Sequence, residues 1–493
     1  MPLNHWVYDF LDRMQTKGIL QPQYGAYPYI RTEVANSLSR IQNKITADHL
    51  TKAELDRFEQ LKGEFVDDLK DADVEIQSGY HERHLLSWSE SDNIQADADL
   101  LFNQKISKLT GDQKKTISHT TGGGFLRGKI TDRFGFFLYT YSKLRKGEDI
   151  EEEQFDPSQG APITISGKNA FSDDASAYFI FNLAHLNIEF GRDEAQWGPG
   201  KNGNLMLSKH EAYFDMLRLQ FQFKRFQFTS IHGKLNYTQS PKFLAAHRLE
   251  LRVFPWLSIA GSELVIYGNR DIEPMYLNPL MPYHVAEHHL GDLDNNTMAF
   301  DATIFPVKNH KLYMEIFLDD FTTSENPFTY YGNKWALLCG WRWIDPLGFK
   351  GWDLHIEYAR VEPYVYTHND SINVYQEYGR SIGHWLGPNS DDLHIKLGYL
   401  ANRDMNSTFY IKRTRRGEGN INVPPDVSKG TRKAFLSGTV ESQWRFGGEL
   451  EVQLFKDCFI NADYSYNQVS NYLRQKDKDQ NYHQIYLSFQ LNY

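Results

Sequence analysis

Three stretches of the chain combine glycine, proline, aromatic residues and histidine with charged and amide side chains. The first covers 191–208 and contains Trp-Gly-Pro-Gly, the second covers 269–289, and the third covers 364–389. Aromatic rings stack on the C–H faces of sugars, while carboxylates, amides and guanidinium groups hydrogen-bond to sugar hydroxyls. These residue types in one place therefore indicate a carbohydrate-binding surface.

Eleven side chains in these stretches are the candidates for such contacts. The predicted glycan-binding residues are Arg192, Asp193, Glu194, Trp197, Tyr276, Asn278, Tyr283, His288, Tyr366, His384 and Trp385. The alternative is that the same rings fold inward and fill the molecule, since tightly folded loops also need glycine at special backbone angles. From the first interpretation, replacing Trp197 and Trp385 together by alanine is expected to weaken glycan retention.

Catalytic and metal-binding patterns are weak in this sequence. His284 and His288 would share a face of a helix, but Glu287 stands in the wrong place for a zinc-binding His-Glu-x-x-His motif. Gly379-Arg380-Ser381-Ile382-Gly383 has the Gly-x-Ser-x-Gly spacing, but it lies within the third stretch and not between a strand and a helix, where a hydrolase nucleophile would sit. The histidines are scattered along the chain, so no Ser-His-Asp pattern is indicated. The chain has only 2 cysteines, which provide neither a disulfide scaffold nor a thiolate metal site. We therefore expect no enzymatic activity, no metal and no cofactor.

Strands carry the three stretches. The last residues, from Ile485 to Tyr493, alternate apolar and polar side chains and end on an aromatic residue. The same alternation recurs upstream, for example over 217–224, 249–253, 312–318 and 393–399. A soluble sheet rarely ends on an exposed apolar edge, whereas a closed membrane barrel has no edge. Roughly eighteen strands of about ten residues predict an all-β fold, a closed antiparallel transmembrane β-barrel.

Composition agrees with a barrel. Aromatic residues make up 14% of the chain, which suits the aromatic girdles of membrane barrels. The mean hydropathy of -0.57 is compatible, because only every second residue of such a strand faces lipid. The net charge of -10 argues against nucleic acid as a partner. Since residue 1 is not preceded by a signal peptide, we expect the sequence to be a mature chain of the cell outer membrane.

Turn lengths predict the two ends of the barrel. Short turns at 224–225, 255–256, 308–309, 345–350, 403–404 and 456–457 are expected on the periplasmic side. Long connections at 192–215, 268–296, 321–333, 367–390, 416–432 and 470–481 are expected outside. Upstream of about residue 178 this alternation fails, because the turn at 132–133 and the segment 145–177 have the wrong parity. One strand is missed or miscounted there.

Residues 1–70 differ from the rest and predict a small periplasmic helical region, followed by a barrel over 71–493. One helical pattern begins at His5, a second at Thr32 as its N-cap, and a third at Thr51 as its N-cap, where Glu54 completes a capping box. The first two patterns resemble an S-layer-homology module through Pro2–Trp6, Gly18–Leu20 and Ile30–Ala35. That resemblance implies contact between residues 1–45 and peptidoglycan or a wall polymer. A helical plug packed under the barrel is the alternative.

Longer motifs point to one family. Gly-Arg-x4-Trp-Gly-Pro-Gly from Gly191, Glu-Pro-x4-Pro from Glu273, Tyr-x-Tyr-Thr-His from Tyr364 and Gly-His-Trp-Leu-Gly-Pro-Asn from Gly383 resemble the Wzi family of capsule-assembly outer-membrane proteins. The resemblance implies an outer-membrane lectin that retains capsular polysaccharide at the cell surface, among outer-membrane lipids and lipopolysaccharide. The alternatives are a carbohydrate-selective or general porin anchored to the cell wall, and a barrel subunit of a larger surface complex. The charges expected inside the barrel, such as Arg248 and Glu357, fit either a filled lumen or a water-filled pore.

Overall fold

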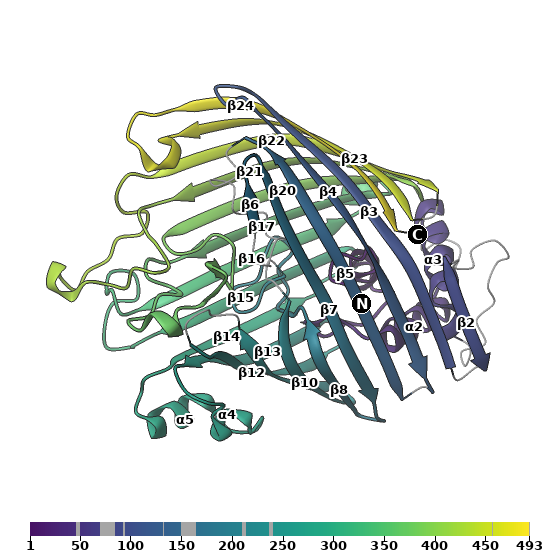
Figure 1. The fold of residues 1–493 in the computed structure, drawn as a ribbon, viewed down its shortest axis with the longest axis horizontal. Coiled ribbons are helices and arrows are strands. Elements are labelled where there is room, and N and C mark those ends of the chain that lie inside the picture. The colour runs from purple at the N-terminus through teal and green to yellow at the C-terminus, as the bar shows by residue number, and fades with distance from the viewer. Residues whose placement is uncertain are drawn as a thin grey trace.

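The chain folds into a single β-barrel, with the N-terminal helices at one end and long loops at the other (Figure 1). The computed structural model describes residues 1–45, 50–69, 84–91, 94–131, 133–148, 164–209, 213–235, 240–455 and 457–492. Within these ranges 18 antiparallel strands close the barrel, as the alternation predicted. Asp132, Lys456 and Tyr493, which the sequence placed in turns or at the chain end, lie outside the described residues.

The barrel closes where its last strand pairs with its first, from Tyr482 opposite Gly111 to Asn492 opposite Leu101. The strands of the barrel are β3 (Ile94–Gly111), β4 (Lys115–Ile130), β5 (Phe134–Gly147), β7 (Asn169–Asn182), β8 (Leu186–Asp193), β10 (Phe214–Phe223), β11 (Phe226–Leu235), β12 (Lys242–Phe254), β13 (Leu257–Gly268), β14 (Asn295–Ile304), β15 (His310–Asp320), β16 (Lys334–Ile344), β17 (Trp352–Val361), β20 (Ser390–Asn402), β21 (Met405–Arg416), β22 (Glu441–Phe455), β23 (Cys458–Ser470) and β24 (Gln480–Asn492). Two further strands extend the sheet: β2 (Leu86–Ser91) pairs with β3, and β6 (Thr164–Ser166) pairs with β7.

The faces of the strands are reversed relative to those of a soluble protein. Apolar side chains that point outward are exposed, with exposed fractions of 52% for Leu249 and 53% for Phe300. Charged side chains that point inward are buried, with exposed fractions of 2% for Arg248 and 1% for Glu315. Water would not favour this arrangement, because it exposes apolar area and buries charge. A lipid environment around the barrel accounts for it.

Turn lengths distinguish the two ends of the barrel. Turns of a few residues join the strands at one end, here called the short-turn end. At the opposite, long-loop end most connections are longer, with the tight turn 112–114 between β3 and β4 as an exception. The parity failure upstream of residue 178 has a specific cause. Strands β7 and β8 are joined by a tight turn at Ala184–His185, flanked by reciprocal backbone hydrogen bonds between Leu183 and Leu186 of 2.9 and 3.3 Å. The sequence prediction missed this turn because neither of its two residues is one of the usual turn formers.

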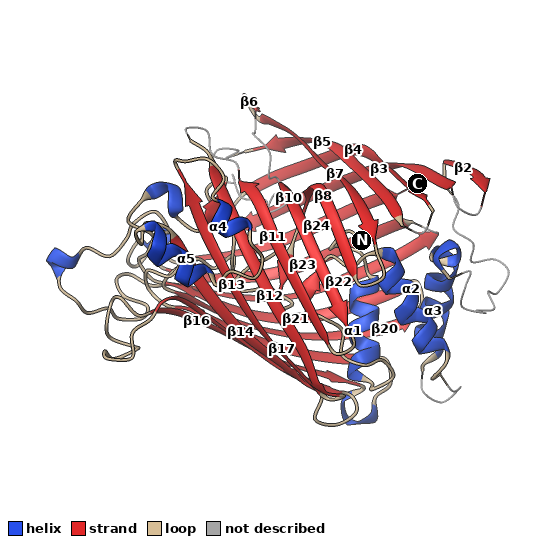
Figure 2. Cartoon of the chain, turned by 90° about the horizontal axis from the view of Figure 1, so that it is seen from below, coloured by secondary structure: helices blue, strands red, loops and turns tan. Residues whose placement is uncertain are grey.

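The N-terminal helices pack into the short-turn end (Figure 2). They are α1 (Val7–Thr16), α2 (Arg31–Gln42) and α3 (Lys52–Glu64), followed by the short turn η1 (Val66–Asp68). The predicted capping box is present, since Glu54 N–H donates to Thr51 Oγ1 at 3.2 Å and Thr51 N–H donates to Glu54 Oε2 at 2.7 Å. Helix α2 begins at Arg31 after Ile30, so the predicted cap at Thr32 is wrong by two positions. The predicted domain boundary at residue 70 falls outside the described residues.

Two further segments fill the barrel from inside. Residues 24–28 form β1 (Ala26–Tyr27), which pairs with β9 (Gln196–Trp197) of the long connection after β8. That connection and the one after β17 share a hydrophobic core with the inner wall of β10–β17, built around Trp197, Phe317 and Tyr366. Several inward-facing side chains of β21 and β22, such as Lys412 and Arg445, are only half-buried, although Thr408 and Thr414 are buried. The lumen is therefore packed along β10–β17 and more open to solvent along β21 and β22.

The remaining elements are short. They are α4 (Pro274–Leu277), α5 (Tyr283–Leu290), β18 (Gln376–Glu377), β19 (Arg380–Ser381), η3 (Pro346–Gly348), η4 (Ser371–Asn373), η5 (Val427–Lys429) and η6 (Tyr472–Arg474). None of the helices in the described ranges has the length and apolar character needed to cross a membrane.

Candidate functional site

Carboxylates of the barrel wall hold the inserted segments by their backbone. Glu315 accepts hydrogen bonds from Leu205 N–H at 3.0 Å and Met206 N–H at 3.2 Å. Glu357 accepts from Lys201 N–H and Asn202 N–H, both at 2.8 Å. A buried carboxylate needs such donors, and the N–H groups of a backbone segment that belongs to no strand or helix need such acceptors. The inward-facing carboxylates thus anchor the chain segments that fill the lumen, here called the filling. Of the two possibilities that the sequence left open, a filled lumen and a water-filled pore, the lumen along β10–β17 is filled.

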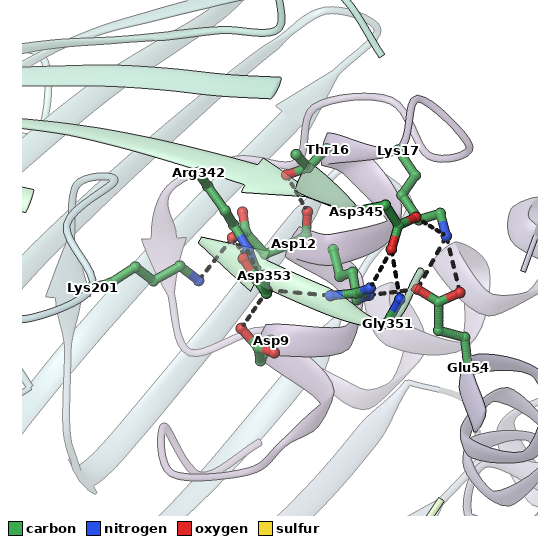
Figure 3. A network of polar contacts seen from close by, with 11 residues as sticks. Asp9, Asp12, Thr16, Lys17, Glu54, Lys201, Arg342, Asp345, Gly351 and Asp353 are labelled. Atoms are coloured by element: carbon green, nitrogen blue, oxygen red, sulfur yellow. Dashed lines mark hydrogen bonds and ion pairs between the residues drawn. The ribbon is translucent and has the colours of Figure 1, made fainter. Parts of the chain in front are cut away.

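A second network joins helix α1 to the wall (Figure 3). Asp12 is 5% exposed and lies among three cations: Lys311 at 2.7 Å, Arg342 at 2.6 Å and Lys201 at 3.2 Å. Burial alone would raise the pKa of Asp12, but the three cations outweigh burial and hold it well below its ordinary value of 3.8. Lys201 belongs to the connection after β8, which enters the barrel from the long-loop end. Asp12 therefore joins helix α1 and this connection to one point of the wall.

Four predicted glycan-binding residues belong to this filling. Trp197 is 1% exposed, and Tyr366 and His384 are fully buried. Tyr366 donates its hydroxyl to Leu205 O at 2.6 Å, and Glu194 accepts from Leu3 N–H at 2.7 Å. These side chains offer no ring face or free carboxylate to a polysaccharide arriving from outside. These four residues follow the alternative interpretation, in which the loop side chains fold inward and fill the molecule. Burial of large rings and of paired polar groups in the lumen stabilises the fold more than their exposure would.

Arg192 and Asp193, at the end of β8, also face other side chains. Arg192 lies 3.5 Å from Asp174 and 3.8 Å from Asp215. Asp193 is buried and accepts from Ser176 Oγ at 3.1 Å. Both hold neighbouring strands together.

The second stretch forms a helical hairpin on the rim of the long-loop end. Tyr276 and Tyr283 are buried in a small core that the hairpin shares with β12 and β13, and Tyr276 donates its hydroxyl to Asp294 at 2.8 Å. Asn278 and His288 are exposed. Among the described residues no group of three or more His, Cys, Asp or Glu side chains could hold a metal ion. Of the predicted residues in this hairpin, only Asn278 and His288 remain open to a ligand.

The same hairpin contains a buried acid that predicts pH dependence. Burial, reinforced by Asp292 and Asp294, raises the pKa of Glu287 from 4.5 to about 8. A raised pKa means that the folded hairpin binds a proton that the unfolded one releases, so its stability falls as the pH rises from 4.5 to 8. We expect hydrogen exchange of residues 283–290, corrected for its intrinsic pH dependence, to be faster at pH 8 than at pH 5. In Glu287→Gln this difference should vanish; an unchanged difference would contradict the assignment.

Trp385 differs from the other rings because it is half-buried and borders the open side of the lumen. Its indole N–H donates to Asn202 O at 2.7 Å, which fixes the ring on the filling. Two cations of β21 approach the ring: Lys412 Nζ lies 4.1 Å and Arg416 Cζ 5.5 Å from its centroid. Each cation also has one acidic neighbour, with Asp392 3.8 Å from Lys412 and Glu441 3.6 Å from Arg416. Trp385, Lys412 and Arg416 are here called the Trp385 site.

The Trp385 site offers an apolar ring beside two partly exposed cations, which is suited to a sugar bearing a carboxylate or phosphate. Lys412 and Arg416 were not among the predicted residues. A signal existed in Lys412-Arg413-Thr414-Arg415-Arg416, where cations occupy both faces of one strand and the usual apolar alternation breaks. Sequence alone did not place this strand opposite Trp385.

Comparison with known proteins bears on the motifs in these loops. The sequence model of the family described as "Capsule assembly protein Wzi" matches residues 166–484, well over half of the chain. The chain belongs to the Wzi family. No curated protein sequence matches it at a significant level. The predicted S-layer-homology resemblance has no support: the family match starts at residue 166, and the first helices plug the barrel instead.

Escherichia coli Wzi has the same fold as this Wzi-family chain, and other outer-membrane proteins align less well. Escherichia coli Wzi aligns with a TM-score of 0.63 at 13% identity, covering 98% of each chain. OccK8 (OprE) of Pseudomonas aeruginosa has a TM-score of 0.47 at 9% identity, covering 80% of this chain and 98% of its own. OccAB1 of Acinetobacter baumannii has 0.46 at 9%, covering 80% and 96%. The alignment with E. coli Wzi extends over the N-terminal helices, so the plugged barrel is the fold of both.

Proposed function

We propose that this Wzi-family chain lies in the cell outer membrane and binds an acidic surface polysaccharide, helping to retain it at the cell. Escherichia coli Wzi, which aligns with a TM-score of 0.63, is described as an outer-membrane protein involved in group 1 capsule assembly and as a carbohydrate-binding β-barrel. The apolar outer face of the strands supports the membrane location. The observation that carries the acidic ligand is the Trp385 site, where Lys412 and Arg416 border a half-buried ring.

The proposed role is binding without catalysis. The strongly buried acids Glu315 and Glu357 are occupied by backbone donors of the filling, so they are not available as general acids or bases. Contact of residues 1–45 with a wall polymer, and of the barrel with lipopolysaccharide, remain predictions of the same proposal. A wide pore has less support, because the filling occupies the lumen along β10–β17.

Purified protein is expected to bind polygalacturonate, an acidic probe, more tightly than dextran, a neutral one. Replacing two cations by apolar side chains of similar length, Lys412→Met with Arg416→Met, should weaken binding of the acidic probe by about thirtyfold, since each of the two lost charge-assisted contacts contributes on the order of 1 kcal/mol. Isothermal titration at moderate salt measures both affinities. In cells, the same variant should release surface polysaccharide into the medium.

A matched control removes two exposed lysines elsewhere at the long-loop end, Lys114→Met with Lys476→Met. It changes the net charge equally and should bind polygalacturonate like the wild type. Trp197 is left intact, because its replacement would open a cavity in the packed lumen and reduce the stability of the fold. The variant Trp385→Phe tests whether the indole ring of Trp385 contributes to binding. Equal binding of polygalacturonate by the wild type and the double methionine variant would refute the site.

A further inference from the structure

A cleft of about 410 Å³ opens at the short-turn end, on the side away from the Trp385 site. Four parts of the molecule meet there: the end of α1, the end of α2, the start of α3, and the turns after β14 and β16. The lining residues are Lys17, Gly18, Ile19, Lys44, Leu50, Thr51, Lys308, Asn309, Asp345 and Lys350. The cleft is of the size of small-ligand sites in other proteins, which hold roughly 300–1,000 Å³.

Four lysines surround this lysine cleft. Lys17 is held by Glu54 at 2.9 Å and by Asp345 at 3.3 Å. Lys44, Lys308 and Lys350 are exposed, and no acidic side chain of the described ranges lies within ion-pairing distance of them. Helix α3, which is 13 residues long, begins at the cleft with Thr51 as its cap and adds the positive end of its dipole. In a chain with a net charge of -10, this is a local surplus of positive charge.

The floor of the cleft is apolar. Ile19 and Leu50 are nearly buried and belong to the core of the helical plug. A cationic rim over an apolar floor suits a ligand that alternates carboxylates with apolar side chains. Peptides have this pattern, whereas a polyphosphate or a hydrophilic polymer would leave the floor unused.

We propose that the lysine cleft binds an acidic, partly apolar peptide segment of a partner protein on the short-turn side. Carboxylates of the segment lie against Lys44, Lys308 and Lys350, and one of its apolar side chains rests on Ile19 and Leu50. The site lies at the opposite end of the barrel from the Trp385 site and does not depend on which glycan binds there. It gives the chain a second interaction surface, through which a partner can recognise a barrel whose plug is in place.

The probe is a fluorescein-labelled hexapeptide that alternates glutamate and leucine, measured by fluorescence anisotropy with the full chain in detergent micelles. We expect saturable binding that weakens with salt, because surface charges are screened. Reversing two turn lysines, Lys308→Glu with Lys350→Glu, should weaken binding by about tenfold. A peptide of equal charge with serine in place of leucine should bind several-fold more weakly, because the floor then loses its apolar contact.

The control is Lys114→Glu with Lys476→Glu, which changes the net charge by the same amount at the long-loop end. It should bind the peptide like the wild type. Both variants change exposed side chains, and far-ultraviolet circular dichroism confirms their folding. An equal loss in the control, equal binding of the serine and leucine peptides, or stronger binding of polyphosphate at equal charge would each overturn the proposal. Polygalacturonate binding is unaffected in every arm, so the outcome is separate from that of the Trp385 site.

Discussion

Replacing Asp12 by asparagine is expected to loosen the helical plug by about 3–5 kcal/mol, the usual effect of removing one partner from a buried ion pair. Asparagine keeps the size of the side chain but leaves Lys311, Arg342 and Lys201 facing one another without their shared carboxylate. Mutual repulsion then favours withdrawal of α1 from the wall. Hydrogen exchange of residues 7–16 measures the effect, with a rise of at least a hundredfold in exchange rate for this free-energy loss.

Asp9 provides the matched control, one turn earlier on the same helix. Its carboxylate is 3.1 Å from Arg342 but 66% exposed, so Asp9→Asn removes a solvated pair that contributes less than about 1 kcal/mol. Exchange of α1 should then stay close to that of the wild type. If Asp12→Asn and Asp9→Asn accelerate exchange equally, the buried network does not hold the plug.

Acid should release the same helix. The three cations keep the pKa of Asp12 well below 3.8, so its contribution to stability is fully present above pH 3.8 and is lost only as the pH falls through the lowered value. The wild-type plug should therefore stay docked at pH 5. In Asp12→Asn this part of the acid sensitivity should be absent.

The barrel was predictable because lipid imposes a simple rule on every strand. Outward positions such as Leu249 and Phe300 must be apolar, and strands in a sheet repeat with period two, so the pattern is local and can be read without knowing the partners. The prediction of the strand count failed at the β7–β8 turn, where the sequence signal for a turn is only two residues long. Ala184 and His185 turn the chain between two strands with ordinary side chains, and a missed two-residue turn changes the parity of everything before it.

The interior was less predictable because its contacts are long-range. Glu315 and Leu205 are 110 residues apart in the chain, and nothing near either shows that one accepts a hydrogen bond from the other. The same limit applied to the loops. Glycine, proline and aromatic residues around Trp197 and Tyr366 serve packing as well as sugar binding, and only the fold shows that these rings are buried. Trp385 alone of the predicted rings borders the more open part of the lumen.

Replacing Glu357 by alanine is expected to detach the connection after β8 from the wall. The N–H groups of Lys201 and Asn202 lose their acceptor, and the hydroxyl of Tyr313, 2.5 Å from Glu357, keeps only His355 Nε2 at 2.6 Å as a partner. Each unsatisfied buried donor costs about 1–3 kcal/mol, so the connection loses several kcal/mol of its anchoring. Because residues 201–202 lie between Asp12 and Trp385, both the plug and the Trp385 site should loosen with it.

Planar-bilayer conductance measures the consequence. The wild type is expected to pass little current, because the filling closes the lumen along β10–β17, while Glu357→Ala should show frequent openings and faster hydrogen exchange over 194–209. Glu449→Ala is the control, since this carboxylate faces inward from β22, is half-buried and has no hydrogen-bond partner among the described residues. Its removal should change neither current nor exchange. Openings in both variants would mean that lost negative charge raises the conductance, whereas openings in Glu357→Ala alone identify the backbone anchor as what keeps the barrel closed.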